Sequence, residues 1–290
     1  MKLNNNLKIT AGIFCLFFVV VFIALSVRHY TVVPANEIQA GDWNHKQIAK
    51  IQQSQSDKFR FAVLSDSHVN PENGGNSATL RKILQKVDEN NYSFAIDVGD
   101  LEVGSANNSP PFFYNLIKNE KTPFLVDVGN HDLTRDEGKY YLNTFGNFYY
   151  SFSNGNSLFI VANDANGAVG AEQMLWLGQQ LKKNYSHKFV FMHIPFYDPR
   201  QGTHHDLDAL SNNSPEVQKL SSLMEKYKPN VVFFGHIHAY YNWVKNGVRY
   251  IITGGAGGSA VGIDPKHDFH NYIEVQVDGD NVTTKVIKIP

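Results

Sequence analysis

The strongest constraint on the fold of this chain is a regular alternation of short apolar runs with helical stretches from residue 59 onward. Five runs rich in β-branched and aromatic residues read as buried strands: Phe59–Leu64, Ser93–Val98, Pro123–Val128, Lys188–Met192 and Asn230–Phe234. Helices are predicted at Ser77–Glu89, Phe112–Lys118, Ala171–Lys182 and Pro215–Tyr227. Strands that alternate with helices predict an α/β fold in which most strands are parallel and buried.

Three further stretches interrupt this alternation and are predicted to form hairpins: Phe148–Asp164, Asn242–Thr253 and Asn271–Ile289. Their expected turns contain the dipeptides Asn154-Gly155, Asn246-Gly247 and Asp278-Gly279. Asn-Gly and Asp-Gly favour the tight turns of hairpins because their residues accept positive φ angles. The additional antiparallel strands predict a second sheet or an antiparallel edge.

Polar residues end each of the five buried strands. In chain order they are Asp66-Ser67-His68, Gly99-Asp100, Gly129-Asn130-His131-Asp132, His193 and Gly235-His236-Ile237-His238. Functional sites of open α/β sheets lie outside the carboxyl ends of the strands. We therefore expect these side chains to meet at one edge.

The residue types at these strand ends are those that bind divalent metals. Carboxylates and neutral imidazoles suit hard and borderline cations, and an aspartate can bridge a pair of ions. The i, i+2 spacing of Asp66 with His68, and of His236 with His238, places both members of each pair near one site. Alone, each aspartate could cap a helix and His193 could be a core histidine. Their coincidence in one order favours a metal centre.

Taken together, these motifs resemble the signature of the calcineurin-like metallophosphoesterases, from about Phe59 to the C-terminus. Supporting features are Tyr149-Tyr150-Ser151-Phe152, Gln173 with Trp176-Leu177, and the glycine-rich Thr253–Gly258. The resemblance implies a four-layer α/β/β/α sandwich with two mixed sheets. It also implies hydrolysis of a phosphate ester by an activated water that bridges two divalent ions, Mn²⁺, Fe²⁺ or Zn²⁺.

The resemblance also implies a role for each site residue. One ion would be held by Asp66, His68, Asp100 and His238. The second would be held by Asp100, Asn130, His193 and His236, with Asp100 as the bridge. His131 would be catalytic, steadying the phosphoryl group in the transition state or protonating the leaving group.

One position departs from the family pattern. Val103 stands where the family often carries an acidic residue, which in some branches orients the histidine equivalent to His131. Asp132 or Glu102 would have to replace it. Purple acid phosphatases carry a tyrosine at that position and lack the histidine equivalent to His68, so this chain resembles another branch. Arg200, His204 and His205 could contact substrate or could belong to a solvated loop.

The N-terminus predicts a membrane anchor that precedes the catalytic domain. Ile9–Val27 is uncharged and long enough to span a bilayer as one transmembrane helix. We expect a cytoplasmic segment over 1–8, a signal anchor over 9–27, a polar stalk over 28–58 and an extracytoplasmic metallophosphoesterase domain over 59–290. The stalk is expected to contain one helix at most and to lie outside the core. A cleavable signal peptide is the alternative, because Ala24-Leu25-Ser26 resembles a cleavage site.

Composition limits the classes of binding partner that we expect, but it does not identify the substrate. The formal charge of −1 and the absence of a basic block give no sign of a nucleic-acid-binding patch. Cys15, the only cysteine, lies in the apolar N-terminal segment, so the catalytic domain has no disulfide. Phosphodiesterase and phosphatase activities stay equally open, as does the oligomeric state. A membrane-anchored binding module with an inactive site is the alternative from another class.

Overall fold

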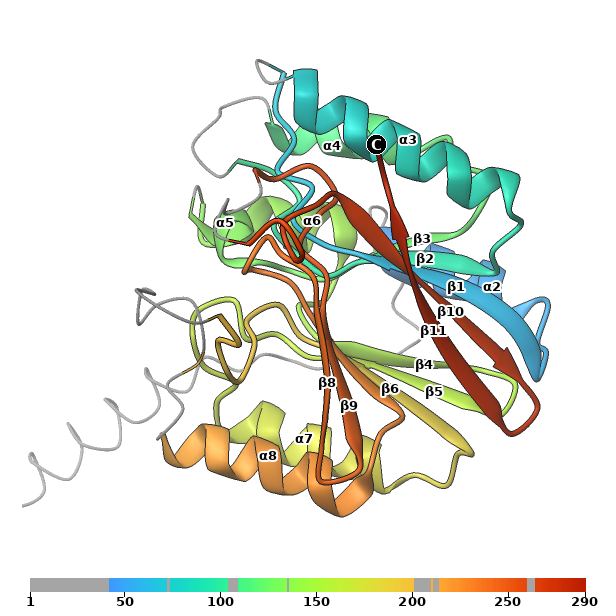
Figure 1. Ribbon diagram of the computed structural model, residues 1–290, viewed down its shortest axis with the longest axis vertical. Helices are drawn as coiled ribbons and strands as arrows, with labels where there is room; N and C mark the ends of the chain where they lie inside the picture. The colour runs from blue at the N-terminus through green and yellow to red at the C-terminus, as the bar shows by residue number, and fades with distance from the viewer. Residues whose placement is uncertain are drawn as a thin grey trace, which may run out of the picture. The chain divides into compact units, whose positions relative to one another are not determined.

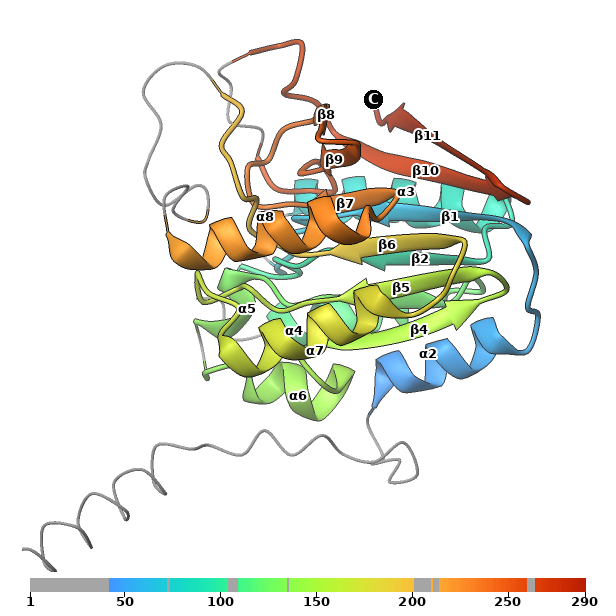
Figure 2. The same ribbon diagram turned by 90° about the horizontal axis from the view of Figure 1, so that it is seen from below.

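A computed structural model describes residues 42–71, 74–103, 109–134, 136–200, 210, 214–259 and 264–290. Within this unit two mixed sheets face each other, with α3 and α4 against one sheet and α7 and α8 against the other (Figure 1). The view turned by 90° looks onto α7 and α8, which lie in front of the strands of the second sheet (Figure 2). The predicted α/β fold with two mixed sheets is confirmed.

The first sheet has the order β11-β10-β1-β2-β3. Its strands are β1 (Lys58–Leu64), β2 (Phe94–Asp97), β3 (Phe124–Val126), β10 (Asn271–Asp278) and β11 (Asn281–Lys288). The strands β1, β2 and β3 are parallel, whereas β10 runs antiparallel to β1 and β11. The helices of this half are α3 (Gly74–Glu89), α4 (Ser109–Ile117), α5 (Asn130–Leu133) and α6 (Lys139–Phe145).

The second sheet has the order β4-β5-β6-β7-β9-β8. Its strands are β4 (Tyr150–Asn154), β5 (Ser157–Val161), β6 (His187–Phe191), β7 (Val231–Phe234), β8 (Tyr241–Lys245) and β9 (Val248–Ile252). The four central strands are parallel, and the edge strands β4 and β8 are antiparallel to their neighbours. Helices α7 (Ala171–Lys182) and α8 (Pro215–Tyr227) have the bounds that the sequence predicts.

A layer of phenylalanines joins the two sheets. Phe61 and Phe94 of the first sheet stack with ring centroids 4.9 Å apart. Phe159 and Phe189 of the second sheet meet the Phe61 ring edge-on at 5.3 and 5.1 Å. All four side chains are fully buried, and buried aromatic pairs add to the free energy gained from burial alone. This layer fixes the two sheets relative to each other and brings their strand ends together.

The three predicted hairpins are present as β4–β5, β8–β9 and β10–β11. Asn246-Gly247 forms the predicted loop, with φ angles of 51° and 81°. The other loops are Gly155-Asn156 and Gly279-Asp280, one position later than predicted. Glycine occupies the first loop position in both, with φ of 52° and 59°, where other residues are disfavoured.

The prediction that residues 28–58 lie outside the core is wrong for the helix α2 (Trp43–Gln52). Ile51 is 2% exposed and packs in the core between the sheets. Asn44 accepts a hydrogen bond from Val126 N and donates one to Val126 O, at 3.0 and 2.9 Å. Its amide thus takes the place of a neighbouring strand beside β3, the edge of the sheet. Two of the three buried side chains of this helix, Asn44 and Gln47, are polar, so an apolar pattern does not identify its buried face.

We expect Asn44→Ala to lower the free energy of unfolding by about 1–3 kcal/mol, because it leaves the buried N–H of Val126 without its acceptor. Urea denaturation of the purified protein measures this change. Lys46→Ala is the matched control, since the Lys46 side chain is exposed on the same helix. Equal stability of the two variants would contradict the role given to Asn44.

Residues 1–41 lie outside the described part of the chain. Among the helices that are described, none is both long and apolar enough to cross a membrane. The segments predicted at 1–8, 9–27 and 28–41 therefore stay predictions.

Candidate metal centre

The seven residues predicted as metal ligands lie together where strands of the two sheets end. Asp66 and His68 follow β1, Asp100 follows β2 and Asn130 begins α5 after β3. His193 follows β6, and His236 and His238 follow β7. Each sheet thus supplies one side of the cluster, whereas the sequence predicts that all of these side chains lie at one edge.

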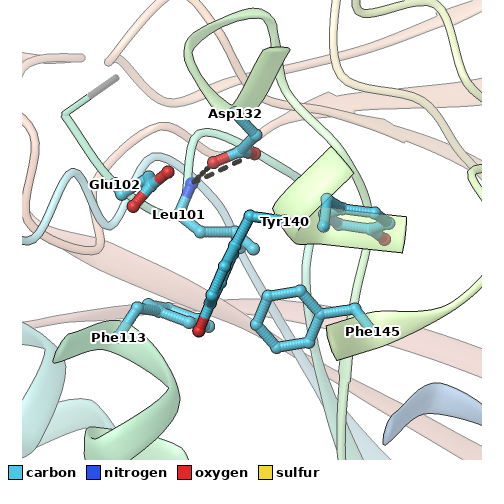
Figure 3. Close-up of a pocket in the computed structure, with 7 residues that line it drawn as sticks. Leu101, Glu102, Phe113, Asp132, Tyr140 and Phe145 are labelled. Atoms are coloured by element: carbon cyan, nitrogen blue, oxygen red, sulfur yellow. Dashed lines mark hydrogen bonds between the residues drawn. The ribbon is translucent and has the colours of Figure 1, made fainter. Parts of the chain in front are cut away.

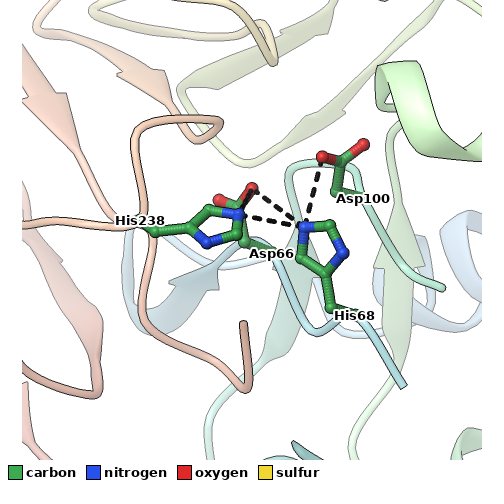
Figure 4. A group of neighbouring side chains, drawn as sticks. All are labelled: Asp66, His68, Asp100 and His238. Atoms are coloured by element: carbon green, nitrogen blue, oxygen red, sulfur yellow. Dashed lines mark hydrogen bonds and ion pairs between the residues drawn. The ribbon is translucent and has the colours of Figure 1, made fainter. Parts of the chain in front are cut away.

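Four of these side chains form the first group: Asp66, His68, Asp100 and His238. Each contributes one ligand atom, and these atoms lie within 4.8 Å of one another. His68 Nε2 is 3.3 Å from Asp100 Oδ2, and His238 Nε2 is 3.3 Å from Asp66 Oδ1 (Figure 4). The Nε2 atoms of His68 and His238 face each other at 2.9 Å, an arrangement that a shared cation would stabilise.

A second group adjoins the first and consists of Asp100, His193 and His236, again with ligand atoms within 4.8 Å. His193 Nε2 lies 3.3 Å from Asp100 Oδ2 and 3.1 Å from Asn130 Oδ1. Asn130 therefore joins this group through His193. Asp100 belongs to both groups, which is the position that a bridging carboxylate requires.

The backbone at five of these residues has left-handed φ angles. The values are 58° at Asp66, 44° at His68, 57° at Asp100, 68° at His236 and 52° at His238. Non-glycine residues rarely adopt such angles, and when they do the surrounding structure must hold them. Strained backbone of this kind concentrates at functional sites.

Two buried carboxylates hold the ligand-bearing loops. Asp132 accepts hydrogen bonds from the backbone N–H groups of Gly129, Asp100 and Leu101, at 2.8, 3.0 and 3.1 Å. Asp164, after β5, accepts them from His193 and Ile194, at 2.9 and 3.1 Å. Asp164 was not predicted as a site residue, because a single aspartate after a hairpin carries no motif. Burial raises the pKa of the Asp164 carboxyl to about 7.

Asp132 and Glu102 were the two residues expected to orient His131. The Asp132 carboxylate is instead used by the backbone amides of the strand ends. Glu102 and Asp132 line a cavity of about 10 Å³ with Leu101 and four aromatic side chains (Figure 3). That volume admits at most about one water molecule. The cavity is therefore too small for a substrate, and we assign Asp132, one of its lining residues, to the support of the loops.

Hydrogen bonds fix the orientation of two imidazoles. His193 Nδ1 donates to Val98 O at 2.8 Å, and His238 Nδ1 donates to Ser259 O at 2.9 Å. Because a carbonyl oxygen only accepts, each Nδ1 carries a proton and each Nε2 is directed at the carboxylates. Histidine ligands of metals characteristically use their other ring nitrogen in this way.

The pKa values of the carboxyl and imidazole groups in this cluster depend on one another. Burial alone raises the pKa of the Asp100 carboxyl, but His193 and His68 outweigh it and hold that pKa well below the usual value. Burial lowers the pKa of His193, but Asp100 outweighs burial and raises it well above the usual value. Imidazole protons thus balance the buried carboxylates here, and a divalent ion would displace them. The oxygen and nitrogen donors and their convergence fit divalent metal ions.

His131 lies beside the two groups without belonging to either. Its ring meets the His68 ring edge-on, with centroids 4.8 Å apart. Its backbone N–H donates to Asp100 Oδ1 at 2.8 Å. Burial lowers the pKa of His131, which favours the neutral imidazole. A neutral imidazole can both donate and accept a hydrogen bond.

Arg200, which was left open as a phosphate contact, is held by Asp198. Its Nη2 lies 2.7 Å from Asp198 Oδ2, and its side chain is 5% exposed. His204 and His205 lie outside the described residues. The structure therefore gives Arg200 a carboxylate partner from its own loop.

Sequence comparison relates this chain to known proteins. Residues 59–240 match the sequence model of the calcineurin-like phosphoesterases. The mouse serine/threonine-protein phosphatase CPPED1 is 27% identical over 55% of this chain and 54% of its own length. A probable cyclic nucleotide phosphodiesterase of Fibrobacter succinogenes is 31% identical over 49% of this chain and 56% of its own length. The matches therefore span about half the length of these relatives.

Among solved structures, a purple acid phosphatase from yellow lupin seeds superimposes with a TM-score of 0.66. The superposition has 17% sequence identity and covers 81% of this chain and 52% of the lupin chain. At this identity the likeness concerns the fold.

Proposed function

Because this chain belongs to the calcineurin-like phosphoesterase family, we propose that it hydrolyses phosphate esters with a two-metal centre at the strand ends. The observation that carries the proposal is the meeting of two donor groups that share Asp100. In the first group Asp66, His68, Asp100 and His238 would hold one ion. In the second, Asp100, Asn130, His193 and His236 would hold the other.

Two divalent ions at such a site supply positive charge to clamp a phosphate and lower the pKa of a water that attacks phosphorus. The protein's own contribution is to hold the donors before substrate arrives. Asp132 and Asp164 fix the backbone of Asp100 and His193 through buried hydrogen bonds. Fixed donors do not have to reorganise during the reaction, which is the main source of electrostatic catalysis.

His131 would act on the phosphoryl group or the leaving oxygen. Its place beside His68, outside both donor groups, supports a role in chemistry and not in ligation. Its backbone bond to Asp100 keeps the residue at a fixed position relative to the bridging carboxylate.

The donor set favours divalent ions, Mn²⁺, Fe²⁺ or Zn²⁺, over a fixed ferric ion. Purple acid phosphatases are among the relatives. In the pattern of that branch, a tyrosine phenolate stands at the position that Val103 occupies in this chain. Here His68 supplies an imidazole to the first group. Neutral nitrogen donors suit divalent ions better than a phenolate would.

The substrate class stays broad. One relative is named a serine/threonine-protein phosphatase and another a probable cyclic nucleotide phosphodiesterase. We therefore propose a phosphatase or phosphodiesterase. The presence of all seven donors supports an active enzyme over a binding module with a degenerate site, because degeneration removes donors.

Hydrolysis tests the proposal directly. The full chain, purified in detergent and freed of metal by chelation, is assayed with p-nitrophenyl phosphate, bis-p-nitrophenyl phosphate and cyclic nucleotides. Mn²⁺, Zn²⁺ and Fe²⁺ are added back in turn. We expect turnover of at least one ester with a divalent ion and only background hydrolysis in the chelated control. Activity that chelation leaves intact would contradict a metal-dependent mechanism.

A further inference from the structure

The glycine-rich loop that follows β9, residues Thr253–Ser259, touches the first donor group at three points. The N–H of Gly258 donates to Asp66 O at 2.7 Å. The carbonyl of Ser259 accepts from His238 Nδ1 at 2.9 Å. The Gly258 backbone also lies against the imidazoles of His68 and His238.

We propose that Gly258 is a positioning residue for the ion of the first donor group: the absence of a side chain there lets the His68 and His238 rings converge. The inference rests on the proposed two-metal centre. A Cβ atom at Gly258 would lie 2.8 Å from His238 Cε1, 2.9 Å from His68 Cδ2 and 3.1 Å from Asp66 O. Gly258 is not among the residues with left-handed φ angles, so the requirement is for space alone.

The two rings have little room to yield. Their centroids are 4.7 Å apart, and their Nε2 atoms are 2.9 Å apart. His68 also meets the ring of His131, and His238 is tied to the Ser259 carbonyl. A methyl group would therefore push Nε2 atoms away from the point on which they converge. Metal–ligand distances tolerate only about 0.2 Å, so displaced imidazoles bind an ion less tightly.

The effect should be confined to one ion. The nearest atoms to a Cβ at Gly258 belong to Asp66, His68 and His238, all of the first group. His193 is held separately, by Val98 O at its Nδ1 and by Asp164 at its backbone. A substitution at Gly258 should therefore distinguish the two ion sites.

Titration of the metal-free full chain with Mn²⁺ by calorimetry, with elemental analysis after dialysis, tests the proposal. We expect the unaltered chain to bind two ions, and Gly258→Ala to bind one normally and the other about 10–100-fold more weakly. Gly74→Ala is the matched control, because no atom lies within 4 Å of a Cβ there and its φ is not left-handed. It should bind both ions normally.

Two ions bound by Gly258→Ala with unchanged affinities would overturn the role of Gly258. An unaltered chain that binds no ion would overturn the two-metal centre as well. Two bound ions without hydrolysis of any ester would count against the proposed activity alone, while the comparison of the variants would still decide the role of Gly258.

A measurement on the unaltered chain guards against a variant that fails to fold. Long-range ¹H–¹⁵N spectra of the histidine rings report which nitrogen carries the proton. With Zn²⁺ bound, we expect His238 to carry a proton at Nδ1, which donates to the Ser259 carbonyl, and to carry no proton at Nε2. A proton on Nε2 of the Zn²⁺-bound His238 would show that the loop does not orient this ring.

Discussion

Asp100→Asn is expected to abolish hydrolysis, with kcat/KM lowered at least about a thousand-fold, or ~4 kcal/mol of transition-state stabilisation. Asp100 is the one residue common to both donor groups. Its Oδ2 lies 3.3 Å from the Nε2 atoms of His68 and of His193. An amide has no net charge and cannot bridge two cations as a carboxylate does. Both ions should therefore bind more weakly, and the centre should lose its bridge.

We expect the substitution to leave the fold intact, because asparagine keeps the shape of the side chain. Its amide oxygen can still accept the backbone N–H of His131. Elemental analysis and the ester assays are run together on the purified variant. Asp278→Asn serves as the control, since that carboxylate is half exposed and pairs with Lys58 at the surface. An Asp100→Asn protein with two bound ions and undiminished turnover would refute the bridge.

The sequence predicts most of the fold because its strands and hairpins are local features. The Asn246-Gly247 loop and the bounds of α7 and α8 follow from turn chemistry and helical periodicity. The arrangement in two mixed sheets came from the family resemblance, and the order of the strands within them was not predicted. Local propensity carries no information on which strands pair across a long separation in sequence.

The sequence predicts the site residues at positions where metal binding accepts only a few residue types. Aspartates and histidines at successive strand ends predicted a metal centre, and the family resemblance implied their division into two donor groups. The supporting residues are less restricted. An aspartate that follows a strand, such as Asp164, is common, and only the structure shows that it accepts a hydrogen bond from the backbone N–H of His193. Gly258 is one of four glycines in a short run, and only its distance to two imidazoles distinguishes it.

The helix α2 shows a different limit. Its buried face includes Asn44 and Gln47, and its composition reads as a solvated segment. Asn44 is buried because its amide satisfies the N–H and C=O of Val126 at the edge of the sheet. Such pairing depends on a strand about 80 residues later in the chain. Hydrophobic patterning cannot detect it, because the contact is made by hydrogen bonds.

His131→Ala should lower kcat by roughly 10²–10⁴-fold, the range typical of general acid–base groups, while leaving both ions bound. The His131 ring belongs to neither donor group, and alanine keeps the backbone N–H that donates to Asp100 Oδ1. Elemental analysis of the variant should therefore match that of the unaltered chain. His45→Ala, on α2, is the control for loss of an imidazole elsewhere.

The choice of substrate then separates the two roles open to His131. If the imidazole protonates the leaving oxygen, the loss in kcat should be small for p-nitrophenyl esters, whose leaving group departs without a proton. It should be much larger for esters of aliphatic alcohols. If the imidazole steadies the phosphoryl group, the loss should be similar for both kinds of ester, because the charge on phosphorus-bound oxygens is similar. Full activity with every ester, or loss of an ion, would show that His131 has neither role.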